Sequence, residues 1–188
     1  MYLPVKYACQ GLDARSGLRY IAIYSHKPHQ QQECVMESVE IAKAFISATN
    51  NILSTMAGLE PKVGAPFVKN GPEAFGDFSA IIGVTGDHKG SICVTFSRSA
   101  AENVVQAMLG DDIEDLEQDA IDTVGEISNM VSGQARATLA ERGVVLQGST
   151  PTIITGEKHR VTHLSKAPVM CIPFSMPEGT FIVEFCLE

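Results

Sequence analysis

The stretch D-T-V-G-E-I-S-N-M-V-S-G-Q-A, residues 122–135, has the spacing of an amphipathic helix. On a helical wheel of roughly 100° per residue, its apolar residues and those next to it fall on one side. We expect that side to pack against the rest of the protein; it consists of Ala120, Val124, Ile127, Val131, Ala135 and Thr138. The stretch also contains two glycines, each of which costs a helix interior about 1 kcal/mol relative to alanine. The glycines therefore need a reason that lies outside the helix itself.

The opposite side of this helix carries the candidate functional residues. Asp122, Glu126, Asn129 and Gly133 fall within a sector of roughly 100°. Glu126 and Asn129 are three residues apart, so their side chains are neighbours on one face. Gly133 lies one turn beyond Asn129 and removes a side chain beside it. Two interpretations remain open: the bare surface admits another molecule, or Gly133 allows tight packing within the protein.

Helices and hairpins follow one another on both sides of this stretch. We predict helices over residues 36–58, 97–110 and 111–142, the last of which begins in an acidic run that complements the helix dipole. Strands rich in β-branched residues, separated by turn residues, are predicted within 78–97 and 150–187. Because there is no strict alternation of strand and helix, we expect an α+β domain in two layers, with long helices packed on a largely antiparallel sheet.

Composition excludes several classes of protein. The chain has 188 residues, of which 45% are hydrophobic, so one domain with a real core is expected. A net charge of −8 without a cluster of basic residues argues against nucleic-acid binding. No stretch approaches the roughly 18 apolar residues of a membrane span, and the beginning of the chain lacks the pattern of a signal peptide. We expect a cytoplasmic protein that does not enter membranes.

The first part of the chain differs from the rest. Residues 1–35 carry four basic and two acidic residues and end in the polar stretch 25–34, which is typical of a linker. We interpret 1–35 as an extension that is either poorly ordered or lies upstream of a natural start at Met36, and 36–188 as a single domain.

The arrangement of Asp122, Glu126 and Asn129 as D-x-x-x-E-x-x-N, followed by M-V-S-G-Q-A and by Pro151, resembles the CheX, CheC and FliY family of chemotaxis phosphatases. The resemblance is closest to CheX and extends over nearly the whole chain after Met36. It implies a CheC-like fold and an enzyme that dephosphorylates a response regulator of the CheY type. The spacing to Pro151 is one residue shorter than the CheC pattern.

The resemblance also assigns roles to the helix residues. Glu126 matches the glutamate that contacts a conserved lysine of the regulator, and Asn129 matches the asparagine that enters its active site. We expect Asn129 to position the attacking water and Glu126 to anchor the partner; general-base catalysis by Glu126 remains an alternative. Asp122 and Gly133 complete the partner-binding face. No cofactor of its own is implied, because the regulator's receiver domain holds the Mg²⁺.

The first long helix looks like a degenerate copy of this one. Aligning Asn51 with Asn129 places Ala48 opposite Glu126 and Ala44 opposite Asp122, which predicts a single active site per chain. The resemblance to CheX also implies a homodimer.

Two other functions remain possible from the sequence alone. One is a non-catalytic binding module of the flagellar-switch type, against which the intact Glu126 and Asn129 pair argues. The other is a phosphatase for a receiver domain outside chemotaxis.

The two histidines His159 and His163 are four residues apart, a spacing that could ligate a metal on a helix. They fall in a strand and turn region, where this spacing does not align the rings, so we expect no metal site there.

Overall fold

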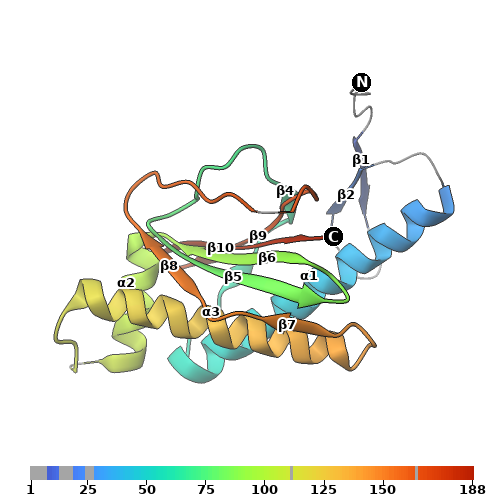
Figure 1. The fold of residues 1–188 in the computed structure, drawn as a ribbon. Helices are drawn as coiled ribbons and strands as arrows, with labels where there is room; N and C mark the ends of the chain where they lie inside the picture. Colours follow the sequence, from blue (N-terminus) through green and yellow to red (C-terminus); the bar gives the residue numbers. More distant parts are fainter. Residues whose placement is uncertain (1–7, 13–18, 24–27, 111, 164) are drawn as a thin grey trace.

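The computed structural model describes residues 8–12, 19–23, 28–110, 112–163 and 165–188. Helices cover one face of a large antiparallel sheet, and two long loops run across the other face (Figure 1). The predicted two-layer α+β architecture is therefore confirmed. None of the helices in the described residues combines the length and apolar character that crossing a bilayer requires.

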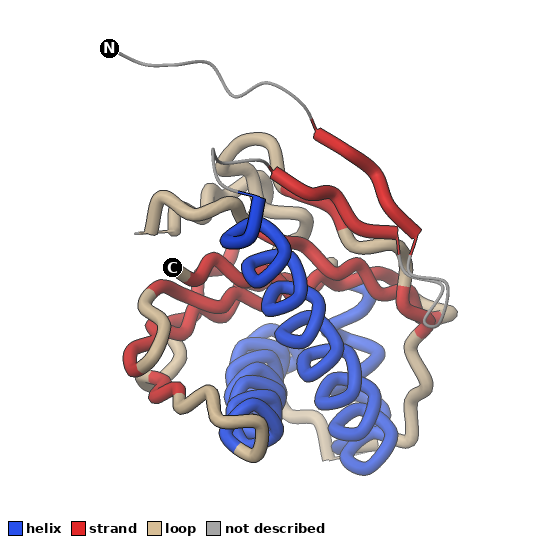
Figure 2. Tube along the Cα trace, turned by 90° about the vertical axis from the view of Figure 1, so that its right-hand side faces the viewer, coloured by secondary structure: helices blue, strands red, loops and turns tan. Residues whose placement is uncertain are grey.

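Three helices form the first layer, α1 (Pro28–Ala57), α2 (Arg98–Leu109) and α3 (Leu116–Ala140). The Ser97 side chain caps α2 by accepting a hydrogen bond from the Ala100 backbone N–H. Asp115 caps α3 in the same way, accepting from the N–H groups of Glu117 and Gln118 at 3.1 and 3.2 Å. The acidic run thus begins α3 as predicted. The tube view shows the helices on the same side of the strands (Figure 2).

The second layer is a sheet of eight strands in the order β3-β9-β10-β6-β5-β7, with β4 also pairing β9 and β8 also pairing β5. The strands are β3 (Lys62–Val63), β4 (Phe67–Val68), β5 (Phe78–Gly86), β6 (Gly90–Phe96), β7 (Leu146–Gly148), β8 (Thr152–Thr155), β9 (Met170–Met176) and β10 (Gly179–Leu187). A separate hairpin pairs β1 (Ala8–Leu12) with β2 (Arg19–Ile23).

Alternation along the central strands separates a core face from an outer face. Phe96, Phe174 and Phe181 point toward the helices and stack with ring centroids 4.7–4.8 Å apart. Phe45 of α1 stacks on Phe185 of β10 in the same core. The helices and the sheet are therefore joined by a continuous apolar layer, which fixes the position of α3.

The outer face of the sheet holds a buried charged cluster. Lys69 donates hydrogen bonds to both carboxylate oxygens of Glu184 at 2.8 and 2.9 Å, and the two side chains are 2% and 0% exposed. His163 lies 3.2 Å from the same carboxylate and 2.7 Å from the Ser91 hydroxyl. His159 contacts Ser79 at 2.7 Å. The two histidines therefore hold the outer loops to the sheet.

The structure differs from the sequence-based expectation at several boundaries. The first helix begins at Pro28 rather than Met36, so much of the expected linker 25–34 is helical. Proline suits the first helical position because its missing N–H has no intrahelical partner there. The third helix ends at Ala140 rather than Arg142, and Gly143 follows with φ +88°.

The division into 1–35 and 36–188 stays a prediction. The order expected for residues 1–7, 13–18 and 24–27 concerns residues that lie outside the described part of the chain. Three short strands, β3, β4 and β7, were not predicted from the sequence.

Candidate functional site

The outer face of α3 carries the predicted functional residues. Asp122, Glu126 and Asn129 are exposed, whereas Val124, Ile127 and Val131 are buried at 1–2% exposure. The helical wheel therefore separated the two faces correctly. Thr138, which was expected on the core side, is half-buried at its edge.

Glu126 and Asn129 are free to meet another molecule. Within the described residues, neither side chain makes a hydrogen bond or ion pair with the protein. Asp122 differs, because its Oδ1 accepts a hydrogen bond from Gln118 Nε2 at 3.0 Å. The carboxylate and amide that were assigned to chemistry are thus unengaged, while Asp122 is held by its own helix.

The two glycines of the opening stretch have different surroundings. A Cβ on Gly125 would lie 3.3 Å from Ile153 Cδ1, so this glycine allows close packing of α3 against β8. A Cβ on Gly133 would meet only the tip of Arg136, 4.0 Å away. The surface beside Asn129 is therefore open, and of the two interpretations of Gly133 the structure supports the one that leaves room for a second molecule.

Helix α1 does not offer a second copy of the site. Ala44 and Ala48, which align with Asp122 and Glu126, are buried at 2% and 1% exposure. Asn51 is exposed, but its Nδ2 donates to Gln134 Oε1 of α3 at 3.0 Å. The residues that match the motif in α1 thus face the core or bind α3.

Pro151 lies in the connection between β7 and β8 and is half-buried. This connection borders α3, because β7 and β8 both contact that helix. The proline belongs to the strand connection that flanks the site.

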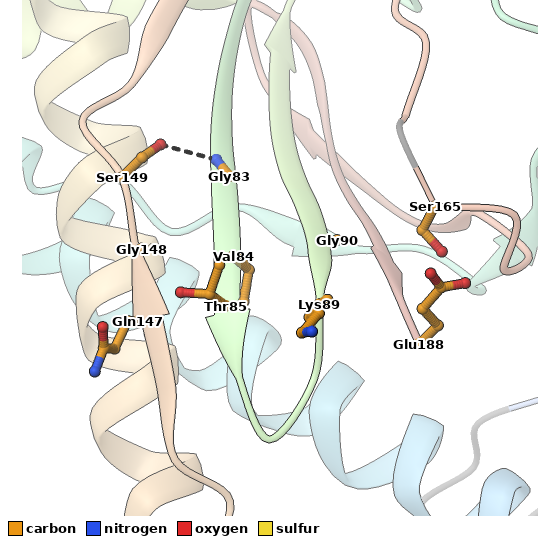
Figure 3. Close-up of a pocket in the computed structure, with 10 residues that line it drawn as sticks. All are labelled: Gly83, Val84, Thr85, Lys89, Gly90, Gln147, Gly148, Ser149, Ser165 and Glu188. Carbon is orange, nitrogen blue, oxygen red and sulfur yellow. Dashed lines mark hydrogen bonds between the residues drawn. The ribbon is translucent and has the colours of Figure 1, made fainter.

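A groove of about 530 Å³ lies away from this helix face (Figure 3). It is lined by strands β5, β6 and β7, with Thr85, Lys89 and Ser149 among its side chains, and α3 is seen behind the strands. Ser149 Oγ accepts a hydrogen bond from the Gly83 N–H at 3.0 Å. Glu126 and Asn129 do not line this groove, so the candidate site on α3 lies outside it.

Residues 78–175 match the sequence profile of the family described as "Chemotaxis phosphatase CheX". The chain belongs to the CheX family. The match spans α3, the hairpin of β5 and β6, and β8, which together form the candidate site and its support. This confirms the resemblance that the motif around Glu126 and Asn129 indicated.

Similar proteins extend the family relationship. A structure of the chemotaxis protein CheX from Desulfovibrio desulfuricans is 56% identical, covers 79% of this chain and 99% of that chain, and has a TM-score of 0.75. The "CheY-P phosphatase CheX" of Thermotoga maritima is 28% identical over 137 residues, which are 72% of this chain and 87% of that protein.

A structure of the CheX-CheY-BeF3-Mg²⁺ complex from Borrelia burgdorferi shares the fold. It is 24% identical, covers 79% of this chain and 97% of that chain, and has a TM-score of 0.66.

Sequence reasoning missed two features near or behind the site. The first is the buried pair of Lys69 and Glu184, for which the only signal was a carboxylate within the apolar run of β10. The second is Arg136, whose guanidinium borders Gly133 and lies over Gly148. Nothing in the sequence indicates that contact, because Gly148 belongs to a short strand that was not predicted.

Proposed function

We propose that this protein hydrolyses the aspartyl phosphate of a CheY-type response regulator, with Asn129 positioning the attacking water and Glu126 anchoring the regulator. The observation that carries the proposal is an exposed, unengaged glutamate and asparagine pair on one helix face of a CheX-family chain. The T. maritima relative bears the name of such a phosphatase, and the B. burgdorferi complex contains CheY.

The hydrolysis of the aspartyl phosphate requires few catalytic groups from this protein. An aspartyl phosphate is a reactive acyl phosphate, and the receiver domain supplies the Mg²⁺ that neutralises the phosphoryl oxygens. Water attacks phosphorus, the bond from phosphorus to the aspartate oxygen breaks, and inorganic phosphate and a free carboxylate result. What remains to be supplied is a water held in line with that bond.

The Asn129 amide suits this task. Its carbonyl can accept a hydrogen bond from the water and its NH₂ can donate one, and neither group carries the negative charge that would repel phosphoryl oxygens. Asn129 belongs to a 25-residue helix, which fixes the position of its Cα atom. A loop would hold it less accurately.

Glu126 lies next to Asn129 and acts as an anchor in this proposal. An ion pair between Glu126 and a lysine of the receiver fixes the register in which the asparagine enters. Asp122 extends the acidic surface by about one turn, and Gly133 leaves room for the receiver on the other side of Asn129. The protein needs no cofactor of its own, and we infer a homodimer.

The experiment is phosphate release from a panel of phosphorylated receiver domains. Asn129→Ala should lower kcat by about 100-fold or more, as removal of a transition-state hydrogen bond does, without lowering the melting temperature. Asn70→Ala, an exposed amide in a loop on the other face of the sheet, is the matched control. Parental kcat in Asn129→Ala would exclude the assigned role.

Glu126→Ala tests the anchor separately. It should raise KM, and the difference from the parent should shrink at high salt because the lost contact is between charges. Glu141→Ala, an exposed carboxylate just beyond α3, is the control. If Glu126→Ala lowers kcat and leaves KM unchanged, the glutamate acts in the chemical step and not as an anchor.

The panel also decides between receivers. If phosphate is released only from receivers outside chemotaxis, CheY is excluded as the substrate. Binding of receivers without release would identify a binding module.

A further inference from the structure

Three arginines lie in or next to α3, and they differ in their partners. Arg98 pairs with Glu117, and Arg142 pairs with Glu40. Within the described part of the chain, Arg136 forms no ion pair with any carboxylate, and its single hydrogen bond runs from Nε to Ser132 Oγ at 3.3 Å. One guanidinium next to the catalytic face is therefore left with its charge uncompensated.

The Arg136 side chain is seated between two glycines. A Cβ on Gly148 would lie 2.9 Å from Arg136 Cζ and 3.1 Å from Nε and Nη2, so the guanidinium occupies the place of the missing side chain. On the other side, Nη2 is 4.0 Å from the Cβ position of Gly133. The hydroxyl that accepts from Nε belongs to the fully buried Ser132. The arginine is therefore held in place, and Nε is the one nitrogen already engaged.

Its position relates it to the face that binds the partner. Arg136 follows Asn129 by seven residues, which is about two turns and roughly 20° around the helix. Its guanidinium borders Gly133, where the surface is open. A molecule that covers Gly133 therefore comes close to the Nη2 atom of Arg136.

The charges along α3 are ordered in one direction. Carboxylates occupy its N-terminal half on the exposed side, from Glu117 to Glu126, and Arg136 lies in its C-terminal half. A partner that offers a cation to Glu126 and a carboxylate to Arg136 fits in only one of the two directions along the helix. A guanidinium is well suited to the second contact because its planar fork binds a carboxylate through two parallel hydrogen bonds.

We propose that Arg136 is a specificity-determining residue that binds a carboxylate on the surface of the receiver domain, outside its phosphorylation site. The proposal rests on the function proposed above and adds a second contact, opposite in charge to the Glu126 anchor. Arg136 then sets which receivers dock and in which direction. It acts on binding and not on the chemical step, because the amide that positions water is Asn129.

The test compares five variants in phosphate release and in binding to the beryllofluoride-activated receiver. Arg136→Gln should raise KM and Kd about tenfold at low salt while kcat stays within about twofold. Arg136→Lys keeps the charge and loses the fork, so it should give an intermediate KM. Arg142→Gln removes a neighbouring arginine that already has a partner, and should leave KM unchanged.

Gly148→Ala perturbs the position of the guanidinium without changing any charge. The new methyl group displaces the end of a flexible side chain, so the fold should persist while KM rises as in Arg136→Gln. Gly83→Ala is the matched control, because its Cβ would meet Ser149 Oγ at an ordinary 3.4 Å.

The possible results separate this inference from the proposed function. A parental KM in Arg136→Gln, with parental turnover intact, overturns the role of Arg136 and leaves the phosphatase in place. A lower melting temperature of Arg136→Gln with an unchanged KM assigns Arg136 to packing on β7 and also overturns its role in binding the receiver. A parent protein that releases no phosphate from any receiver refutes the proposed function and this inference together.

Discussion

Removing one member of the buried pair Lys69 and Glu184 should destabilise the fold far more than removing both. The two side chains are 2% and 0% exposed and are joined by hydrogen bonds of 2.8 and 2.9 Å. Glu184→Gln leaves the Lys69 ammonium buried without a counter-charge, and Lys69→Met leaves the carboxylate with His163 alone. Each should cost about 3–5 kcal/mol, a large part of the roughly 5–15 kcal/mol that stabilises a typical domain.

The double variant Lys69→Met/Glu184→Leu replaces both charges with apolar side chains of similar size. It leaves His163 without its contact to the carboxylate, which should cost about 1–2 kcal/mol. The double variant is therefore expected to be more stable than either single variant. Such a result would show that desolvation of the unpaired charge dominates the cost of each single substitution.

Urea denaturation followed by far-UV circular dichroism measures these free energies, since the chain has no tryptophan. Phosphatase activity of the folded fraction should stay at the parental level, because the pair lies on the face of the sheet opposite α3. A cost below about 1 kcal/mol in both single variants, or a double variant that loses the sum of the two, would refute the reasoning.

Three further predictions concern helix α3 and the buried thiols. Gly133→Ala should stabilise the protein by up to about 1 kcal/mol, more than Gly125→Ala, whose methyl group meets Ile153 at 3.3 Å. Gly133→Arg should keep the parental melting temperature and impair dephosphorylation. Unimpaired turnover of Gly133→Arg would contradict an open docking surface. Ser128→Ala should raise the unfolding free energy by about 1 kcal/mol in a urea titration, because the Ser128 hydroxyl is buried without a hydrogen-bond partner; a loss would indicate a bond that the hydroxyl makes. Burial raises the pKa of Cys93 from 9.0 to about 12, so the native thiol keeps a proton that the unfolded chain loses. The free energy of unfolding should therefore fall as pH rises above 9, by about 1.4 kcal/mol per pH unit. In urea titrations between pH 8 and 10, Cys93→Ala should show a smaller fall of this free energy with pH.

The sequence predicted best what depends on local periodicity. The two faces of α3, the β5–β6 hairpin and the caps at Ser97 and Gly110 follow from spacing and turn residues a few positions apart. The start of α1 at Pro28 was missed because the residues before Met36 are polar and lack an apolar stripe.

The parts of the site that depend on distant segments could not be predicted. Exposure of Glu126 and Asn129 follows from the helical wheel, but the seat of Arg136 needs Gly148, which joins the sheet through a three-residue strand. Likewise, Glu184 could be placed on the outer face of β10 by alternation, whereas its partner Lys69 comes from a loop 115 positions earlier in the chain. The roles of Asp122, Glu126, Asn129 and Gly133 in catalysis and binding remain predictions.

The sheet separates the buried charges that hold the outer loops from the exposed face of α3 that carries Glu126 and Asn129. Substitutions on an exposed helix face typically change stability by no more than about 0.5 kcal/mol, and sites without shared neighbours contribute additively. An evolving lineage can therefore exchange residues around Glu126 and Asn129 without approaching the threshold at which the fold fails, and under the function proposed above such exchanges would change the receiver that is bound. Gene duplication would then give paralogues that insulate parallel signalling pathways from one another while sharing one unchanged scaffold.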